Sequence, residues 1–336
     1  MISITVFVGL DYHKDSVNVC VVNAAGKQLA NRKCPNDWRA IEQVVRRCGT
    51  PARVALEACC GAAHLADELA AQAGWPMHLA HPGYVSRLKQ SPDKSDYSDA
   101  RLLADLERVG YLPPVWLAPE PVRELRRLVR YRQQLVGERR NLKLRVAALL
   151  REQRVFIQGA TWTKVWRSRV ATLDELSEQA RWIIARQLAR LEPLEAEIRL
   201  VEERLRSVTD HDPVVAKLLE QKGVGLITAV TLRAEIGRFD RFRNGKQLAR
   251  FCGLTPRNAS SGQRQADAGL IKAGNPQLRA TLIEAAHRLL RFDERWSDLG
   301  EQLLARGKPK CVVIAALANR WLRGLHHQLA SLSTAA

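Results

Sequence analysis

The segment VFVGLDYHKDS (residues 6–16) joins an apolar, β-branched run to an acidic end. Apolar residues from Ile2 to Leu10 predict a first strand, which ends at Asp11. We expect a second strand over Val17–Val22 and a third over Leu29–Cys34. The segment therefore opens a meander of three strands.

Helical and extended patterns alternate after this meander. Helical spacing or strand composition predicts the following elements in order: a helix over 38–47, a strand over 53–56 that runs into Glu57, a helix over 61–73, a strand over 76–80 and a helix over 96–108. A meander followed by strand–helix units predicts an α/β domain, a mixed sheet with helices packed on it. We place this domain at residues 1–115.

The remainder of the chain has mainly helical patterns. Long helices are expected over 119–155 and 173–208, with apolar residues every seventh position: Leu128, Leu135, Leu142, Leu149 and Ile184, Leu191, Ile198, Leu205. The heptads predict an antiparallel coiled-coil arm at 116–212, although a plain bundle core has the same spacing. Pro193 is expected to kink or break the second helix. Residues 213–336 are predicted to form a mostly helical domain with a loop at 253–275 and closing helices at 277–291 and 311–330.

The 336-residue chain carries 53 Lys and Arg against 35 Asp and Glu, a formal charge of +18. Residues 120–170 hold 14 basic and 4 acidic side chains, and residues 221–280 hold 11 and 3. Such segregation favours a polyanionic partner, with nucleic acid as the first candidate, over two merely solvated helical faces. Seven Cys without a CxxC pair argue against a zinc site or disulfide framework and favour a reducing cytoplasm. We expect no membrane span and no export signal.

Four acids stand out as candidate metal ligands. Asp11 and Glu57 follow strands, and Asp96 and Asp99 lie three apart at the start of a helix. If the two strands are neighbours, both acids emerge at one edge of the sheet, where α/β sites form. Oxygen ligands suit Mg²⁺, and two such ions can clamp the attacking and leaving oxygens of a phosphoryl transfer. Taken singly, each acid is explained as well by a turn or a helix cap.

These segments resemble a known family. GLDYHKDS (9–16), LEACCG (56–61) and DKSDYSDARLLADL (93–106) are similar to the DEDD-type transposases of the bacterial insertion-sequence "one-ten" family. Residues 221–263 and 273–288 resemble the C-terminal transposase domain of that family. The resemblance covers nearly the whole chain. It implies a domain similar to the Holliday-junction resolvase RuvC, with an RNase H-like fold.

The resemblance also implies the chemistry. The metal-binding acids fall on Asp11, Glu57, Asp96 and Asp99, with Mg²⁺, two ions per site, as the expected cofactor. The family's nucleophilic serine falls on Ser261, although the adjacent Ser260 leaves the assignment open by one position. The implied function is DNA recombination through a serine–DNA intermediate, with donor and target duplexes as substrates and a non-coding bridge RNA as guide. The implied assembly is a homotetramer that acts on the bacterial nucleoid.

Basic residues suggest where nucleic acid binds. Gly223 and Gly225, with Lys222 beside them, resemble a helix-hairpin-helix turn, for which a simple tight connection is an equal alternative. Guanidinium groups suit phosphates. The predicted contacts are Arg126, Arg127, Arg130, Arg139, Arg140 and Lys143 on the first long helix, and Arg257 and Arg264 around the proposed serine.

Two other functions fit the residues. One is a structure-selective junction endonuclease, which keeps the metal site and uses water in place of Ser261. The other is a non-enzymatic basic scaffold whose acids are structural. Since a serine hydroxyl is a poor nucleophile without a base or metal, and no His lies near Ser261 in the sequence, its activation has to come from elsewhere.

Overall fold

The computed structural model describes residues 5–88, 95–260, 267–271 and 274–332. The chain divides into two compact units, residues 1–118 and 119–336, and each contains a hydrophobic core of its own. The finer division with boundaries after residues 115 and 212 remains a prediction.

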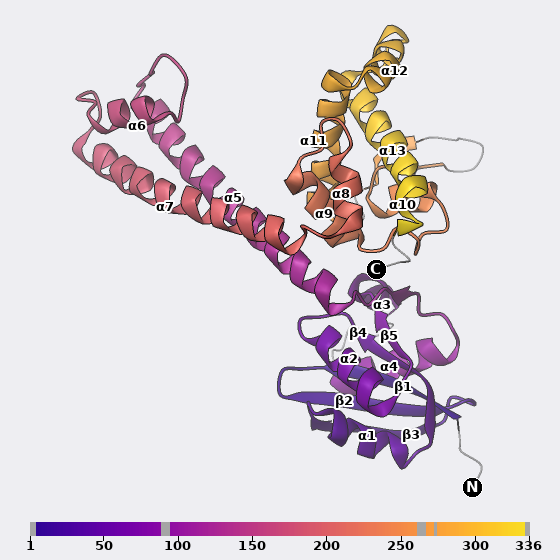
Figure 1. The fold of residues 1–336 in the computed structure, drawn as a ribbon. Helices are drawn as coiled ribbons and strands as arrows, with labels where there is room; N and C mark the ends of the chain where they lie inside the picture. Colours follow the sequence, from indigo (N-terminus) through magenta and orange to yellow (C-terminus); the bar gives the residue numbers. More distant parts are fainter. Residues whose placement is uncertain (1–4, 89–94, 261–266, 272–273, 333–336) are drawn as a thin grey trace. The chain divides into compact units, whose positions relative to one another are not determined.

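The first unit is built on a mixed sheet with the strand order β3-β2-β1-β4-β5-β6 (Figure 1). Its strands are β1 (Thr5–Tyr12), β2 (Ser16–Asn23), β3 (Gln28–Pro35), β4 (Thr50–Glu57), β5 (Met77–Ala80) and the two-residue β6 (Pro114–Val115). β1, β2 and β3 form an antiparallel meander, while β4 runs parallel to β1 and β5 runs parallel to β4. The predicted mixed sheet is confirmed, and its order is consistent with an RNase H-like domain.

Helices cover both faces of this sheet because side chains alternate along a strand. Val6, Val8 and Leu10 point to one face and are buried with residues of α1 (Trp38–Arg46) and α2 (Ala62–Ala73). The opposite face carries α4 (Asp96–Arg108), preceded in the chain by the short α3 (Pro82–Leu88). Strands buried on both faces read as continuous apolar runs, as β1 and β2 do.

Two long helices begin the second unit. α5 (Glu120–Glu152) and α7 (Glu178–Val208) run side by side, with α6 (Lys164–Ala171) near the end where they are joined (Figure 1). The heptad positions Leu135, Leu142, Leu191 and Leu205 are buried. α7 continues through Pro193, so the proline does not end the helix. That these helices form a coiled-coil arm remains a prediction.

The remaining helices form the larger core of the second unit. They are α8 (Pro213–Leu219), α9 (Leu226–Ile236), α10 (Gly245–Phe251), α11 (Pro276–Phe292), α12 (Glu294–Ala305) and α13 (Lys310–Leu329). The predicted mostly helical C-terminal part is confirmed. The expected loop at 253–275 is wrong in part, because β7 (Pro256–Asn258) and β8 (Asp267–Leu270) pair antiparallel within it. No helix in the described parts of the chain combines the length and the apolar character that a bilayer crossing requires.

Candidate functional site

Asp11 and Glu57 lie at the ends of adjacent parallel strands. β1 and β4 are in register up to the pair Leu10 and Leu56, so the next residues on the two strands are the two acids. Alternation places both on the face that α4 covers, because Gly9 and Ala55, two residues earlier, contact α4 or pack with it. The shared sheet edge predicted for these acids is therefore present.

Helix α4 brings the other two acids to this face. Gly9 allows the close approach, since a Cβ there would overlap the carbonyl oxygen of Ala100. Asp96 and Asp99 occupy the first turn of α4, where the helix dipole and free N–H groups favour negative charge. Asp99 is buried, with 8% of its surface exposed. The N-terminus of α4 thus adds carboxylates to the end of the sheet that already holds Asp11.

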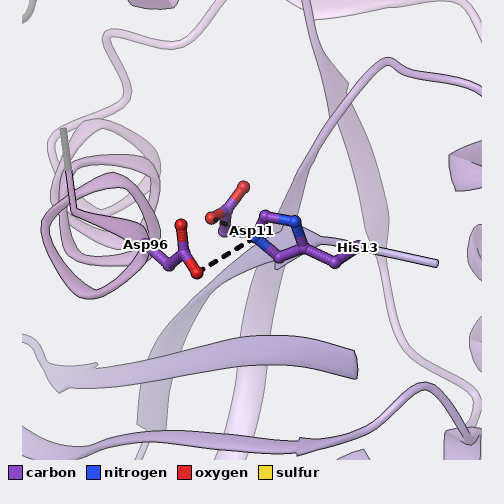
Figure 2. Close-up of side chains that lie close together, drawn as sticks. All are labelled: Asp11, His13 and Asp96. Atoms are coloured by element: carbon purple, nitrogen blue, oxygen red, sulfur yellow. Dashed lines mark hydrogen bonds and ion pairs between the residues drawn. The ribbon is translucent and has the colours of Figure 1, made fainter. Parts of the chain in front are cut away.

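His13 joins two of these acids (Figure 2). Its Nε2 lies 3.2 Å from Oδ2 of Asp11 and 3.3 Å from Oδ2 of Asp96. Among the described residues, Asp11, His13 and Asp96 form the group whose ligand atoms all lie within 4.8 Å of one another. Glu57 and Asp99 are outside this trio. His13 was not predicted as a site residue. It lies just past the end of β1, two residues after Asp11, and this closeness in the sequence was the signal that could have indicated it.

Burial raises the pKa of Asp11 above its ordinary value. The nearby charges of Asp99 and Asp96 raise this pKa further, and His13 lowers it. Bringing carboxylates together in a half-buried place is unfavourable unless a cation neutralises them.

The donor set fits a divalent cation. Asp11 and Asp96 present hard carboxylate oxygens, which Mg²⁺ and Mn²⁺ prefer. The imidazole of His13 is a poorer ligand for Mg²⁺ and better suited to hold the two carboxylates together by hydrogen bonding. The cluster also meets the expectation that a cation site in an α/β fold lies at the ends of the strands.

The predicted nucleophile and one predicted cation fall in a part of the chain that the structure does not describe. Ser261 and Arg264 lie outside the described residues, in the stretch of chain that joins β7 to β8. The neighbouring Ser260 is exposed, and its backbone N–H donates to Oδ1 of Asn258 at 2.7 Å. Arg257, on β7, is exposed.

Several predicted nucleic-acid contacts on α5 are engaged within the protein. Arg130 donates to both carboxylate oxygens of Glu235 at 2.9 and 3.0 Å. Arg126 lies 3.7 Å from the same carboxylate and donates to the carbonyl oxygen of Ala234. Arg127 pairs with Glu120 at 2.7 Å. These contacts tie α5 to itself and to α9.

Further along α5, the cations face solvent. Arg140 is exposed and Arg139 is partly exposed, and among the described residues neither has an ion pair. Lys143 lies 4.0 Å from Glu195 and above the ring of Trp162. The part of α5 around Arg139 and Arg140 is therefore the more available for phosphates.

The glycine turn joins two short helices. Asp212 caps α8 by accepting from the N–H groups of Val214 and Val215, and Arg233 of α9 pairs with Asp212 at 2.6 Å. Gly223 has a φ of +78°, which favours glycine, and Gly225 precedes the first residue of α9. Lys222 is exposed beside them. The geometry suits either a phosphate-binding hairpin or a simple connection.

Comparisons with known proteins identify the class. Residues 8–154 match the model of the DEDD transposases of the IS110 type, described as "Transposase", and residues 215–301 match "Transposase IS116/IS110/IS902 family". A "Probable family 20 transposase" of Pseudomonas aeruginosa is 31% identical over 287 residues, covering 80% of this chain and 81% of that protein. The "Transposase for insertion sequence element IS1111A" of Coxiella burnetii is 28% identical over 324 residues, covering 93% and 86%. The "Transposase for insertion sequence element IS1328" of Yersinia enterocolitica is 27% identical over 325 residues, covering 94% of each.

The fold and these relatives define a DNA transposase. The chain belongs to the IS110 family of insertion-sequence transposases. Membership implies DNA substrates, and the DEDD class implies use of a divalent metal, for which the Asp11–His13–Asp96 cluster is the matching feature.

Proposed function

We propose that this transposase cuts and rejoins DNA with Mg²⁺ held at Asp11, Glu57, Asp96 and Asp99 and with Ser261 as the nucleophile. The observation that carries the proposal is the meeting of Asp11 and Asp96 around His13 at one end of an RNase H-like strand order. We also assign the first unit to the RuvC-like branch of that fold on the family resemblance, with which the parallel pairing of β1 with β4 and the acids at their ends agree.

Each acid has a role that follows from its position. Asp11 and Asp96 are the direct ligands, since their oxygens already face a common point beside His13. Glu57 extends the site along the sheet edge, and Asp99 contributes charge from a buried position. A bound divalent cation would neutralise charge on the phosphate and polarise its oxygens. His13 keeps the two carboxylates oriented.

The covalent step uses the hydroxyl of Ser261. Its oxygen attacks the phosphorus of one strand and loses its proton, while the bond from phosphorus to a deoxyribose oxygen breaks and that oxygen takes up a proton. The product is a phosphodiester between the serine and one DNA end. Attack by the sugar hydroxyl of another strand reverses the step and releases the serine, so the number of bonds is conserved.

Sequence choice is proposed to come from a non-coding guide RNA. The charge surplus of residues 120–170 and 221–280 suits a phosphate backbone, and base pairing by a guide leaves the protein to recognise shape and charge. A homotetramer would hold donor and target duplexes together. These two parts of the proposal rest on the family resemblance.

The test is covalent capture of labelled donor DNA on denaturing gels, with the purified full chain, Mg²⁺ and the element's flanking RNA. Ser261→Ala is expected to abolish the protein–DNA adduct, and Ser260→Ala is the matched control that retains it. An adduct that survives in Ser261→Ala and disappears in Ser260→Ala moves the nucleophile by one residue.

The same assay separates the junction endonuclease. Cleaved DNA without any adduct, unchanged in Ser261→Ala, supports water as the nucleophile and contradicts the serine mechanism. Omitting the RNA is expected to abolish recombination of donor and target plasmids, and full recombination without it contradicts the guide.

A further inference from the structure

Asn18 lies beside the acidic cluster on the neighbouring strand. In the antiparallel pairing of β1 with β2, Asn18 is directly opposite Asp11, so both side chains point to the face that α4 covers. Cys20 and Val22, the next residues on this face of β2, pack against Ala100 and Ala104 of α4. Asn18 is therefore covered by the end of α4 that carries Asp96 and Asp99.

The amide of Asn18 is completely buried and has no partner. Its exposed fraction is 0%, and neither Nδ2 nor Oδ1 has a hydrogen-bond partner among the residues that the structure describes. Burying an unpaired amide is unfavourable, and native proteins rarely tolerate it without a reason. An aliphatic residue would continue the pattern of β2 at no such cost, as Val17, Val19 and Val21 do on the other face.

The surroundings of Asn18 indicate which hydrogen-bond partners its amide can have. Across the sheet, the register aligns Glu57 on β4, Asp11 on β1, Asn18 on β2 and Lys33 on β3 in one row. Asn18 is the neutral member next to the carboxylates, with one acceptor oxygen and two N–H donors. A carboxylate oxygen or a cation-bound water is the partner that such a group lacks.

We infer that Asn18 is a positioning residue of the cation site, whose amide is satisfied by hydrogen bonds to the acids and the water of the cation-loaded state. The inference rests on the proposed function, because it requires that the acidic cluster binds a divalent cation. Asn18 orients Asp11 from the neighbouring strand, as His13 orients it from the segment that follows β1. Because cation binding would supply partners to this buried amide, cation binding and the stability of the fold are coupled at this residue.

The test measures Mn²⁺ binding to the full chain by calorimetry, together with the unfolding temperature with and without Mn²⁺. Asn18→Val is expected to raise the metal-free unfolding temperature, because it removes the unpaired amide, and to weaken Mn²⁺ binding about tenfold to a hundredfold. Asn18→Asp keeps an oxygen at the same place and is expected to retain or tighten Mn²⁺ binding, while lowering the metal-free unfolding temperature through added repulsion.

Cys20→Ala is the matched control, since Cys20 is buried on the same strand and face. It is expected to change the unfolding temperature without changing Mn²⁺ affinity. Wild-type affinity in Asn18→Val overturns the inference and leaves the cation site intact. Absence of Mn²⁺ binding in the wild-type chain overturns the cation site itself, and the inference with it. If Asn18→Val does not fold, the Mn²⁺ affinity of Asn18→Asp decides, with Asp11→Asn measured beside it as the reference for a lost cation ligand. An affinity of Asn18→Asp as low as that of Asp11→Asn would contradict a role for an oxygen at position 18.

Discussion

Helix α4 presents a buried acid to the same face of the sheet near each of its ends, Asp99 at the N-terminal end and Glu107 at the C-terminal end. At the C-terminal end, the protein supplies basic neighbours for the buried acid. Glu107 lies 2.8 Å from Nδ1 of His78 and 3.8 Å from Arg53. These neighbours offset part of the cost of burial and of the unfavourable dipole at a helix C-terminus, although Oε2 of Glu107 is buried without a hydrogen-bond partner among the described residues.

The N-terminal end is arranged differently. Asp99 lies in a turn with Asp96, near Asp11, and the basic side chain in contact with Asp11 and Asp96 is His13. Burial, together with the nearby charges of Asp99 and Asp96, raises the pKa of Asp11 here, whereas Glu107 lies beside His78 and Arg53. The comparison teaches that Glu107 is held by basic neighbours from the sheet, whereas Asp11 and Asp96 gather around His13, the arrangement at which we propose a bound cation.

The largest effect is expected from a substitution in the Asp11–His13–Asp96 cluster at the N-terminal end of α4. Asp11→Asn should reduce DNA cleavage by about a thousandfold or more, because it removes a cation ligand worth several kcal/mol in the transition state. Gel assays of cleavage under single-turnover conditions measure this loss. Asp15→Asn, an exposed residue on the same segment, is the control and should cleave normally. Equal cleavage by wild type and Asp11→Asn would refute a catalytic role for the cluster.

A smaller effect is expected from a substitution of Glu107, the acid paired with His78 and Arg53 at the C-terminal end of α4. Glu107→Ala should lower the free energy of unfolding of the first unit by about 1–3 kcal/mol, because the half-buried His78 loses its hydrogen bond to this buried carboxylate. Urea denaturation followed by tryptophan fluorescence measures this, with the exposed Glu68→Ala expected within about 0.5 kcal/mol of wild type. Cleavage by folded Glu107→Ala should be unchanged, and a loss as large as that of Asp11→Asn would show that the two ends are not functionally distinct.

The smallest effect extends the comparison to α5. Arg126 and Arg130 are balanced by Glu235, whereas Arg139 and Arg140 face solvent. The double change Arg139→Gln and Arg140→Gln should lower the slope of log affinity for nucleic acid against log salt by about two, one per lost phosphate contact. Filter binding across salt concentrations measures the slope. The double change Arg199→Gln and Arg204→Gln, at exposed positions of α7, is matched in charge and should leave the slope unaltered; equal slopes for both doubles would remove this part of α5 from the interface.

Local patterns were sufficient to predict much of the fold. The helix expected over residues 96–108 has those bounds, because Ser95 and the acids of the first turn mark its start clearly. The adjacency of β1 and β4 was the condition on which the predicted acid site depended, and the parallel pairing of the two strands meets it. The pairing of β7 with β8 was not predicted, because strands of three and four residues are too short to show a two-residue period. Helix α12 was not predicted as a separate helix, because it occupies a short stretch between the two longer helices α11 and α13.

The finer parts of the site depend on contacts between distant residues. Arg130 pairs with Glu235, 105 residues away, and no local pattern distinguishes it from the exposed Arg140. The burial of Asn18 depends on α4, which comes some eighty residues later in the chain. His13 is the exception, since it lies two residues after Asp11 in the sequence, just past the end of β1. The sequence therefore indicated which acids belong to the candidate site, whereas the packed structure was needed to see which charged side chains lie beside each acid.

The central claim is that the acids gathered around His13, Asp11 and Asp96, bind a divalent cation. Crystals of the full chain grown with Mn²⁺ and examined at the manganese absorption edge test it directly. The account predicts an anomalous peak about 2.1 Å from carboxylate oxygens of both Asp11 and Asp96, with none beside Glu107. Manganese bound elsewhere, with the Asp11 and Asp96 oxygens still joined only through His13, would contradict it.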